Sequence, residues 1–560
     1  MMSVTNLNVD QDGLSSTDTH DVFNQSLALE NYNLYGSDVP LQEAVRANGT
    51  VDEGVLRAYG QMCGRADVIN WGYEANESKP QLDTHDRFGH RVDLVRFHPA
   101  YHQLMDMALS AGIHSGPWQA DAKHAHVKRA ALSFMQSQID AGHGCPLTMT
   151  FAAVPTLKLT PSVAEVWLPK VLKNAYQPDN IPYYEKRAVT IGMGMTEKQG
   201  GSDVQANTTS ARPINGSGSG ALYALNGHKW FLSAPMCDAF LMLAKTDGGL
   251  SCFLVPRWRE DGQKNGLYLQ RLKNKMGNVS NASSEVELRD AHGWMVGEEG
   301  RGVPAIIEMV ALTRFDCMVG SSAGQRQAVV QAVHHARRRQ AFGARLIDQP
   351  LMQNVLADLQ LEAEGSLALT MRMARALDNA DDPAEQLLMR LGTAVGKFWI
   401  CKRTPGHAYE AMECLGGNGV IENCIMPRLY REAPINAIWE GSGNIQALDV
   451  LRAIGKTPAV LDQWFTELAT STGIFPDLDL AVSKLREAFD GLRDPVYQAR
   501  QLVQQLALTM QASLLARYAP KAVAEAFVRS RLAGGQAIYG CLPDGLNIAA
   551  ILDRVLPEQY

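Results

Sequence analysis

Residues 192–203 read GMGMTEKQGGSD and mark the place where the pattern of the chain changes. Upstream, from about 40 to 182, apolar residues recur mainly at helical spacing, whereas residues 188–303 have the pattern of strands. Closely spaced glycines let a backbone approach a flat ligand or a phosphate, and Thr196 and Ser202 add hydroxyls. An ordinary glycine-rich loop leading into a β region is the alternative. The stretch matches neither G-x-G-x-x-G nor a Walker loop, so it does not support the nucleotide-binding folds built on those loops.

The strand-like region contains two predicted hairpins. One surrounds Asn226-Gly227, a dipeptide typical of type I′ turns, and the other surrounds a turn at residues 247–249. The predicted strands are residues 222–225, 228–232, 238–245, 250–255, 267–269 and 284–288. Long helical patterns follow at residues 324–340, 350–379, 383–415 and 502–518, after a helical segment at 118–141 near the start.

Capping residues support these helices. Asp382-Pro383 is a good helix start, and Gly416-Gly417 is a good stop. The sequence therefore predicts an α+β multidomain fold. Its expected parts are an N-terminal helical domain (1–187), a middle β domain (188–303), a C-terminal helical bundle (304–455) and a helical extension (456–560).

Composition limits the class of protein. The 560 residues are 46% hydrophobic and 20% charged, so the chain can bury a large core, and this excludes disorder and small disulfide scaffolds. The net charge of −7 gives no global argument for binding nucleic acid or an anionic membrane. The first twenty residues lack Lys and Arg, no run of about 18 apolar residues occurs, and the nine cysteines form no C-x-x-C. We therefore expect a soluble cytoplasmic protein with reduced thiols, no membrane contact and no metal ligands.

Three further segments are candidates for chemistry. In KWFLS (229–233) an aromatic and a hydroxyl suit a planar cofactor, although an aromatic strand is also ordinary core. RRRQAFG (337–343) follows a helix; its arginines suit a pyrophosphate or, alternatively, a solvated helix end. In IWEGSGNIQ (438–446) the Glu440 carboxylate in an apolar setting suits a general base, or else it caps the next helix.

Taken in their order along the chain, these segments resemble the motifs of the acyl-CoA dehydrogenase flavoprotein family. The family motifs M-T-E-x-x-x-G-S-D, N-G-x-K-x-[WF]-[IL]-[TS], R-x-x-F-G, L-G-G-N-G and [YW]-E-G-[ST]-x-x-I-Q match residues 195–203, 226–233, 339–343, 415–419 and 439–446. FHPA (97–100), PLTMTFAA (146–153), residues 192–204 and the extension past Ile454 further resemble its AidB subgroup, which is linked to the bacterial response to alkylation damage.

The resemblance implies a middle β-barrel domain, bound FAD and desaturation of an acyl-CoA or related thioester. In the enzymes of this family a base removes the α proton of the thioester while the β hydrogen leaves as hydride to the flavin. The family motif that contains this base, [YW]-E-G, places it at Glu440 in this sequence. Thr313 occupies the position that carries the base in other members, and it cannot act as one. The base's own backbone amide and a flavin ribityl hydroxyl are expected to stabilise the developing enolate.

The resemblance also implies the cofactor contacts and the assembly. Residues expected to meet the flavin through backbone or hydroxyl groups are Met193, Gly194, Met195, Thr196, Gly201 and Ser202. Phe231, Leu232 and Ser233 are expected along the ring, and Ile438, Trp439, Ser442, Gly443 and Asn444 at the flavin, ribityl or adenine parts. Arg339 and Phe342 would reach the ADP part of a neighbouring subunit's FAD in a homotetramer, although Glu413 and Pro350 replace glutamines usual in the family. An electron-transfer flavoprotein is the usual electron acceptor.

Two other functions remain as alternatives. One is a flavoprotein of the alkylation response that binds double-stranded DNA and has weak or vestigial dehydrogenase activity; the other is a structural flavoprotein without a substrate. In the AidB subgroup the extension is the expected DNA contact. Residues 456–560 carry ten Lys or Arg against eleven Asp or Glu, and the nearest approach to a cluster is Arg517, Lys521, Arg529 and Arg531, interrupted by Glu525. Duplex binding needs clustered cations, so this charge pattern favours a solvated helical face.

Overall fold

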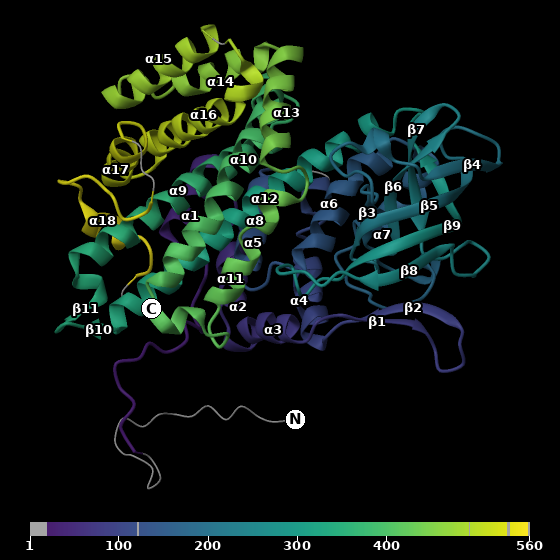
Figure 1. The fold of residues 1–560 in the computed structure, drawn as a ribbon, viewed down its shortest axis with the longest axis horizontal. Helices are drawn as coiled ribbons and strands as arrows, with labels where there is room; N and C mark the ends of the chain where they lie inside the picture. The colour runs from purple at the N-terminus through teal and green to yellow at the C-terminus, as the bar shows by residue number, and fades with distance from the viewer. Residues whose placement is uncertain (1–18, 120–122, 492, 535–537, 558–560) are drawn as a thin grey trace.

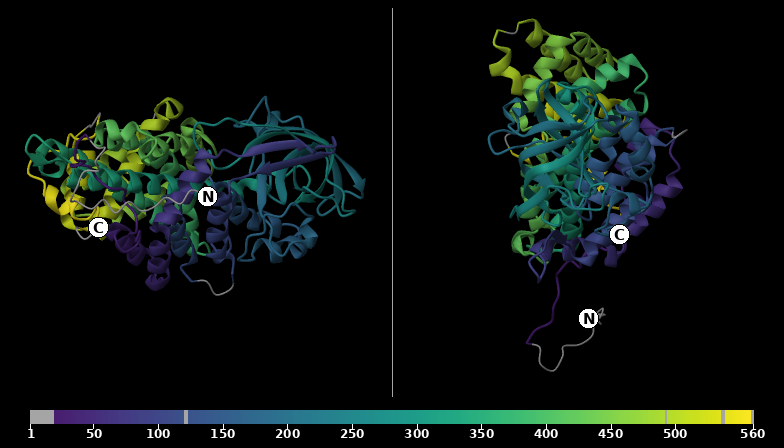
Figure 2. Two further views of the ribbon diagram at one scale, coloured as in Figure 1. Left: turned by 90° about the horizontal axis from the view of Figure 1, so that it is seen from below. Right: turned by 90° about the vertical axis from the view of Figure 1, so that its right-hand side faces the viewer.

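A computed structural model describes residues 19–557, apart from 120–122, 492 and 535–537. Helices form one end of an elongated molecule and a β domain forms the other, as the views in Figures 1 and 2 show. The α, then β, then α order predicted from the sequence is confirmed. Most of the polar N-terminal stretch, and part of the predicted helix at 118–141, lie outside the described residues.

The N-terminal part consists of helices and one hairpin that the sequence patterns did not predict. Its elements are α1 (Val39–Asn48), α2 (Glu53–Cys63), α3 (Ala66–Glu77), β1 (Gln81–His85), β2 (Arg91–Arg96), α4 (Pro99–Ser110), α5 (Ala125–Ser137), α6 (Gly144–Lys158) and α7 (Pro161–Val171). The turn between β1 and β2 forms because Asp86 accepts hydrogen bonds from the backbone N–H groups of Phe88 and His90. Arg96 pairs with Asp83 across the strands at 2.6 Å. These polar, largely exposed strands bury little apolar surface, so their sequence carries a weak strand signal.

The middle part is a closed β structure. Its strands are β3 (Ile191–Gly194), β4 (Ser210–Asn215), β5 (Leu222–Ser233), β6 (Ala239–Thr246), β7 (Gly249–Pro256), β8 (Leu267–Leu272) and β9 (Ser283–Val296). The order along the sheet is β3-β6-β4-β5-β9-β7, with β8 on β9. Because β7 also pairs with β6, the path closes on itself, as expected of a barrel.

The prediction of a hairpin at Asn226-Gly227 is wrong. Strand β5 continues through this dipeptide, because the long strand β9 pairs with β5 both before and after Asn226-Gly227. The register shifts at Gly227, which has φ 152°, and a Cβ there would lie 2.5 Å from the Thr209 hydroxyl. The Asn226 amide bonds the Asp290 carboxylate instead of closing a turn. By contrast, the hairpin of β6 and β7 is confirmed, with Thr246 opposite Gly249.

The C-terminal part is helical. Its elements are α8 (Gly302–Arg338), β10 (Gln340–Ala341), β11 (Ala344–Arg345), α9 (Pro350–Asp378), α10 (Pro383–Glu413), α11 (Met426–Glu432), α12 (Ile435–Ile438), α13 (Gly443–Lys456), α14 (Ala459–Ala469), α15 (Pro476–Asp490), α16 (Pro495–Tyr518), α17 (Lys521–Arg531) and α18 (Ile548–Leu552). The predicted caps of α10 are present: the Asp382 carboxylate accepts from Ala384 N at 2.9 Å, and Gly416 takes a positive φ of 58°. Helix α8 begins at Gly302, well before the pattern predicted. Short 3₁₀ turns occur at Gly116–Trp118, Tyr183–Glu185, Val204–Ala206, Leu346–Asp348 and Gly416–Val420.

Two hydrophobic cores organise these elements. One runs from Leu29 to Leu556 and joins N-terminal helices, the α8–α10 bundle and the extension. The other fills the barrel and includes α6, α7 and the first turns of α8, up to Leu312. Helix α8 therefore passes from one core into the other, and Thr313 lies at the crossing. None of the helices in the described part of the chain combines the length and apolar character needed to cross a membrane.

Candidate functional site

Glu440 lies in a tight connection between α12 and α13. It has φ 57°, and Gly441 has φ 97°, so two consecutive residues occupy the left-handed region. Buried Lys397 of α10 donates to the carbonyls of Trp439 and Gly441 at 2.6 and 2.5 Å. Gln446 donates to the carbonyls of Glu440 and Gly441 at 3.0 Å each. These bonds hold a strained backbone in place, a feature that often accompanies functional sites.

Helix α8 supplies the partners of Glu440. The Thr313 hydroxyl donates to Glu440 Oε2 at 2.8 Å, and Arg314 Nε donates to the Glu440 carbonyl at 3.0 Å. Arg314 also pairs with Asp449 at 2.9 Å. Sequence reasoning excluded Thr313 as a base but missed its contact with Glu440, since 127 residues separate the two.

Cys145 lies beside the end of β5. Its thiol, at the start of α6, lies beside the Ser233 hydroxyl and within electrostatic reach of Glu440 and Lys275. Burial raises the pKa of the thiol to about 11, so it stays neutral near pH 7. Cys145 could not be singled out from the sequence, because a single cysteine has no diagnostic spacing.

The glycine-rich stretch divides into two halves. Gly192 and Gly194 belong to β3, and a Cβ at Gly192 would lie 2.4 Å from the Phe240 ring, so this glycine serves close packing. The six predicted contacts continue from there into the loop: Met193, Met195 and Thr196 are partly buried, Gly194 is buried, and Gly201 and Ser202 are exposed.

Glu197, inside the same motif, anchors the loop to the barrel. Its carboxylate accepts from the buried Lys229 ammonium at 2.8 Å and from the backbone N–H of Thr208 at 2.7 Å. Burial alone would raise the pKa of Glu197, but Lys229 and these hydrogen bonds lower it to about 2. The motif therefore contains a structural ion pair that the sequence analysis did not assign.

The end of β5 presents one aromatic ring to solvent. The Phe231 side chain is 46% exposed, whereas Leu232 is fully buried in the barrel core. Ser233 is partly buried and shares a hydrogen bond of 2.9 Å with Ser283, its partner on β9. Phe231 is therefore not core, which removes the alternative explanation of this aromatic strand.

The residues on both sides of Glu440 in the chain are largely at the surface. Before it, Ile438 is 64% exposed; after it, Ser442 and Asn444 are exposed at the start of α13 and Gly443 is partly buried. The Trp439 ring donates to Asn436 at 2.8 Å.

Arg339 and Phe342 lie elsewhere in the chain. They follow the far end of α8, roughly 40 Å from Thr313 at about 1.5 Å of helical rise per residue. Arg339 donates to the Asn24 carbonyl at 2.7 Å, and Phe342 is completely exposed at the tip of the β10–β11 hairpin. Figure 1 shows this hairpin at the end of the molecule opposite the barrel. One chain therefore does not bring these two residues to Glu440.

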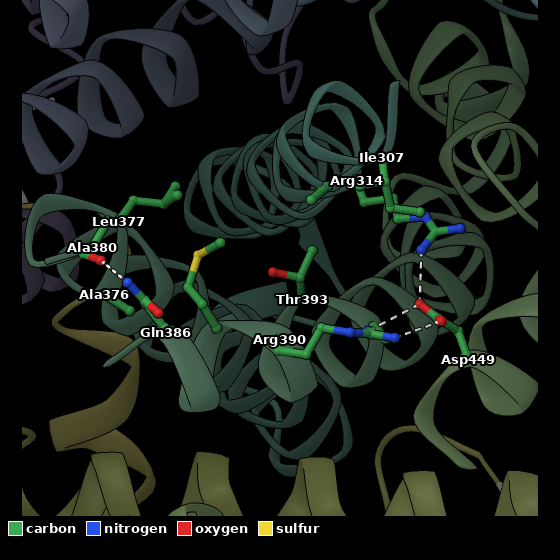
Figure 3. Close-up of a pocket in the computed structure, with 12 residues that line it drawn as sticks. Ile307, Arg314, Ala376, Leu377, Ala380, Gln386, Arg390, Thr393 and Asp449 are labelled. Atoms are coloured by element: carbon green, nitrogen blue, oxygen red, sulfur yellow. Dashed lines mark hydrogen bonds and ion pairs between the residues drawn. The ribbon is translucent and has the colours of Figure 1, made fainter. Parts of the chain in front are cut away.

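A cavity of about 260 Å³ lies among the helices next to Arg314. It is enclosed by α8, α9, α10 and α13, and its walls are mainly apolar side chains such as Ile307 and Leu377. Arg314 lines it and also holds the Glu440 carbonyl. Figure 3 shows Arg314 and Arg390 meeting the Asp449 carboxylate at one end.

Comparison with known proteins identifies the family. Residues 24–178 match the adaptive response protein AidB N-terminal domain, residues 192–291 the acyl-CoA dehydrogenase middle domain, and residues 300–455 the acyl-CoA dehydrogenase C-terminal domain. The chain is 46% identical to AidB of Escherichia coli strain K12 over 518 residues, which cover 92% of this chain and 94% of that protein.

Solved structures agree with this assignment. ACDH-11 of Caenorhabditis elegans in complex with C11-CoA superposes with a TM-score of 0.82 and 26% identity over 93% of each chain. An acyl-CoA dehydrogenase from Bacillus anthracis complexed with FAD has a TM-score of 0.63 over 90% of this chain and 86% of that one, where 17% identity shows the fold alone. The chain is therefore a member of the acyl-CoA dehydrogenase family, whose enzymes are FAD-dependent oxidoreductases, and it carries the N-terminal domain of AidB.

Proposed function

We propose that this protein oxidises an acyl-CoA thioester and that Glu440 is the base that removes the α proton. The observation that carries the proposal is the setting of Glu440. Its carboxylate is held by Thr313, its backbone is fixed by Lys397, Arg314 and Gln446, and Arg314 also lines an apolar cavity.

The residues of the chain fit a bound flavin. Phe231 offers an exposed aromatic face, Ser233 a hydroxyl, and the loop at Thr196 and Ser202 two more hydroxyls and a glycine-rich backbone. Ser442 and Asn444, exposed at the start of α13, offer further polar groups close to Glu440 in the chain. FAD, when bound, accepts the β hydrogen with its electron pair.

In the proposed reaction the protein orients the substrate and moves one proton. Glu440 takes the α proton, while its own backbone N–H meets the thioester carbonyl, where negative charge develops. The hydrogen bonds on the carbonyls of residues 439–441 fix the direction of that N–H before the substrate arrives. Preorganised donors of this kind act where charge appears and need no rearrangement during the reaction.

The cavity beside Arg314 is the proposed site for an extended part of the substrate. Its walls are apolar and it opens next to the residue that holds Glu440. An acyl or pantetheine chain has the shape and polarity for such a space. An electron-transfer flavoprotein is the proposed acceptor of the electrons.

We further propose that the chain assembles as a homotetramer in which the β10–β11 hairpin meets a neighbouring subunit. Phe342 is completely exposed at its tip, and Leu351 nearby is 84% exposed. Val420 and Ile421, which follow the L-G-G-N-G motif, are 66% and 49% exposed. Large apolar side chains left at a surface favour burial against another subunit.

The contacts of the extension give less support to the alternative that the protein binds double-stranded DNA. Arg517 pairs with Glu467 at 2.8 Å, Arg531 pairs with Asp358 at 2.5 Å, and Arg529 donates to the Asp544 carbonyl at 2.8 Å. Three of the four basic residues that suggested a cluster thus already have partners within the protein, Arg517 and Arg531 in largely buried ion pairs and Arg529 at the surface. Binding of DNA through this cluster would require these contacts to be given up.

The proposed activity is tested by anaerobic titration of the FAD-loaded protein with short, branched and long acyl-CoAs. Flavin absorbance near 450 nm is expected to bleach with at least one of them, and Glu440→Gln is expected to abolish the bleaching while retaining FAD. Glu422→Gln, which changes an exposed carboxylate paired with Arg431, serves as the matched control. A flavin that stays oxidised with every acyl-CoA would contradict the proposal.

A further inference from the structure

A chain of three polar side chains leads away from Ser233 into the protein. Ser233 Oγ lies 2.9 Å from Ser283 Oγ, and Lys275 Nζ donates to Ser283 Oγ at 2.9 Å and to the Asn281 carbonyl at 2.8 Å. Ser233 and Ser283 are directly opposite each other on β5 and β9. Lys275 precedes β9 in the loop after β8.

An ammonium can only donate, so Ser283 accepts from Lys275 and keeps its own hydroxyl hydrogen to offer to Ser233. Either hydroxyl can donate in the bond between Ser233 and Ser283. When Ser283 donates, Ser233 accepts from it and the hydrogen of Ser233 is free to point toward another acceptor. The thiol of Cys145 is the neighbour that competes for it.

We propose that Lys275 is a positioning residue for the flavin: through Ser283 it turns the Ser233 hydroxyl toward the ring and places a positive charge behind it. This inference rests on the proposed function, which sets the ring against Phe231 and Ser233. A positive charge near the ring favours the reduced flavin, because reduction adds negative charge to the ring. The attraction is stronger where little water is present to screen it.

Lys275 also faces a second cavity, of about 500 Å³, that lies apart from the one beside Arg314. Lys79, Arg428 and Glu432 line it as well. Burial lowers the pKa of Lys275 to about 8, from an ordinary value of 10.5. The positive charge is therefore present below about pH 8 and is lost as the pH rises through that value, with the cavity as the route for the proton.

Glu432 and Cys145, which also lie near Lys275, have pKa values outside the interval from about pH 8 to 10. Burial, reinforced by nearby Asp140, raises the pKa of Glu432 to about 7. Burial raises that of Cys145 to about 11. Arg428, on α11, adds a guanidinium to the same cavity. The interval from about pH 8 to 10 therefore reports on Lys275.

The test is the reduction potential of the bound FAD, measured by anaerobic dye titration from pH 6 to 10. Lys275→Met is expected to keep FAD and to shift the potential to a more negative value at pH 7. The wild type is expected to show an additional fall above about pH 8 that this variant lacks. Lys275→Arg keeps a charge at every pH and is expected to lose that additional fall while retaining the higher potential.

Lys79→Met is the matched control, because it removes a cation from the same cavity without touching the hydroxyl chain. It is expected to leave the potential unchanged. If Lys275→Met does not fold, the inference is tested by comparing the reduction potential of Lys275→Arg with that of the wild type across the same pH range. Equal potentials in wild type and Lys275→Met at every pH would overturn this inference alone, provided that acyl-CoA still bleaches the flavin. A wild-type protein that holds no FAD would overturn both this inference and the proposed function.

Discussion

At the scale of single residues, the position of the Glu440 carboxylate depends on one hydroxyl. Thr313 fills the position that carries the base in some relatives, and here it donates to Glu440 Oε2 at 2.8 Å. Thr313→Val keeps the shape but not the hydroxyl, so the carboxylate loses the bond that orients it. Because a misplaced base costs rate, this variant is expected to slow acyl-CoA-dependent bleaching at least roughly tenfold. Stopped-flow absorbance measures the rate, and Thr313→Ser should retain it; an unchanged rate in the valine variant would remove Thr313 from the site.

At the scale of elements, the glycine-rich loop is fixed by a buried ion pair rather than by its glycines. Breaking one side of such a pair costs about 3–5 kcal/mol, because the other charge stays buried without a partner. Glu197→Gln, opposite Lys229, is therefore expected to lower the thermal midpoint and to loosen the loop's hold on FAD. Calorimetry and FAD stoichiometry measure these effects. Glu287→Gln, at an exposed pair on β9, is the control.

The same pair predicts a dependence of stability on pH. The pKa of Glu197 is about 2 in the folded protein against an ordinary 4.5, so the carboxylate stabilises the fold above about pH 4.5 and loses this effect as the pH falls toward 2. The difference in thermal midpoint between wild type and Glu197→Gln should therefore narrow across that interval. A difference that stays constant down to pH 3 would show that the charge of Glu197 does not stabilise the barrel.

At the scale of the whole molecule, the extension is part of the main core. Arg554, just after α18, pairs with Glu43 of α1 at 2.6 Å and with Glu364 of α9 at 2.9 Å, so one side chain ties three distant parts of the chain. Arg554→Met leaves Glu364 buried without its cation, and a loss of about 3 kcal/mol or more is expected. Thermal unfolding at a fixed scan rate checks this, with Lys521→Met, at an exposed lysine, as the control. If both variants unfold alike, the ion pairs of Arg554 do not help to hold the extension in place.

Patterns within one element were predicted well from the sequence. Helices α9 and α10 and the β6–β7 hairpin follow from periodicity, caps and a two-residue turn, all of which act over a few residues. Errors arose where distant partners compete with local preference. Asn226-Gly227 favours a turn in isolation, but β9 supplies enough pairing to keep β5 extended through it. The β1–β2 hairpin was missed because its hydrogen bonds join polar, exposed segments.

The candidate site, like the fold, was predictable from the sequence only in part. By itself the sequence determined the order of the elements and the family motifs, because these depend on residue identity and short spacing. The role of Glu440, the four-part division of the chain and the flavin contacts stay predictions. Tertiary structure alone decided that Thr313 and Lys397 meet the Glu440 connection, that Phe231 faces outward, and that Lys275 lies two hydrogen bonds from Ser233. The physical reason is that such contacts join side chains far apart in sequence, and packing of the two cores determines which of them meet.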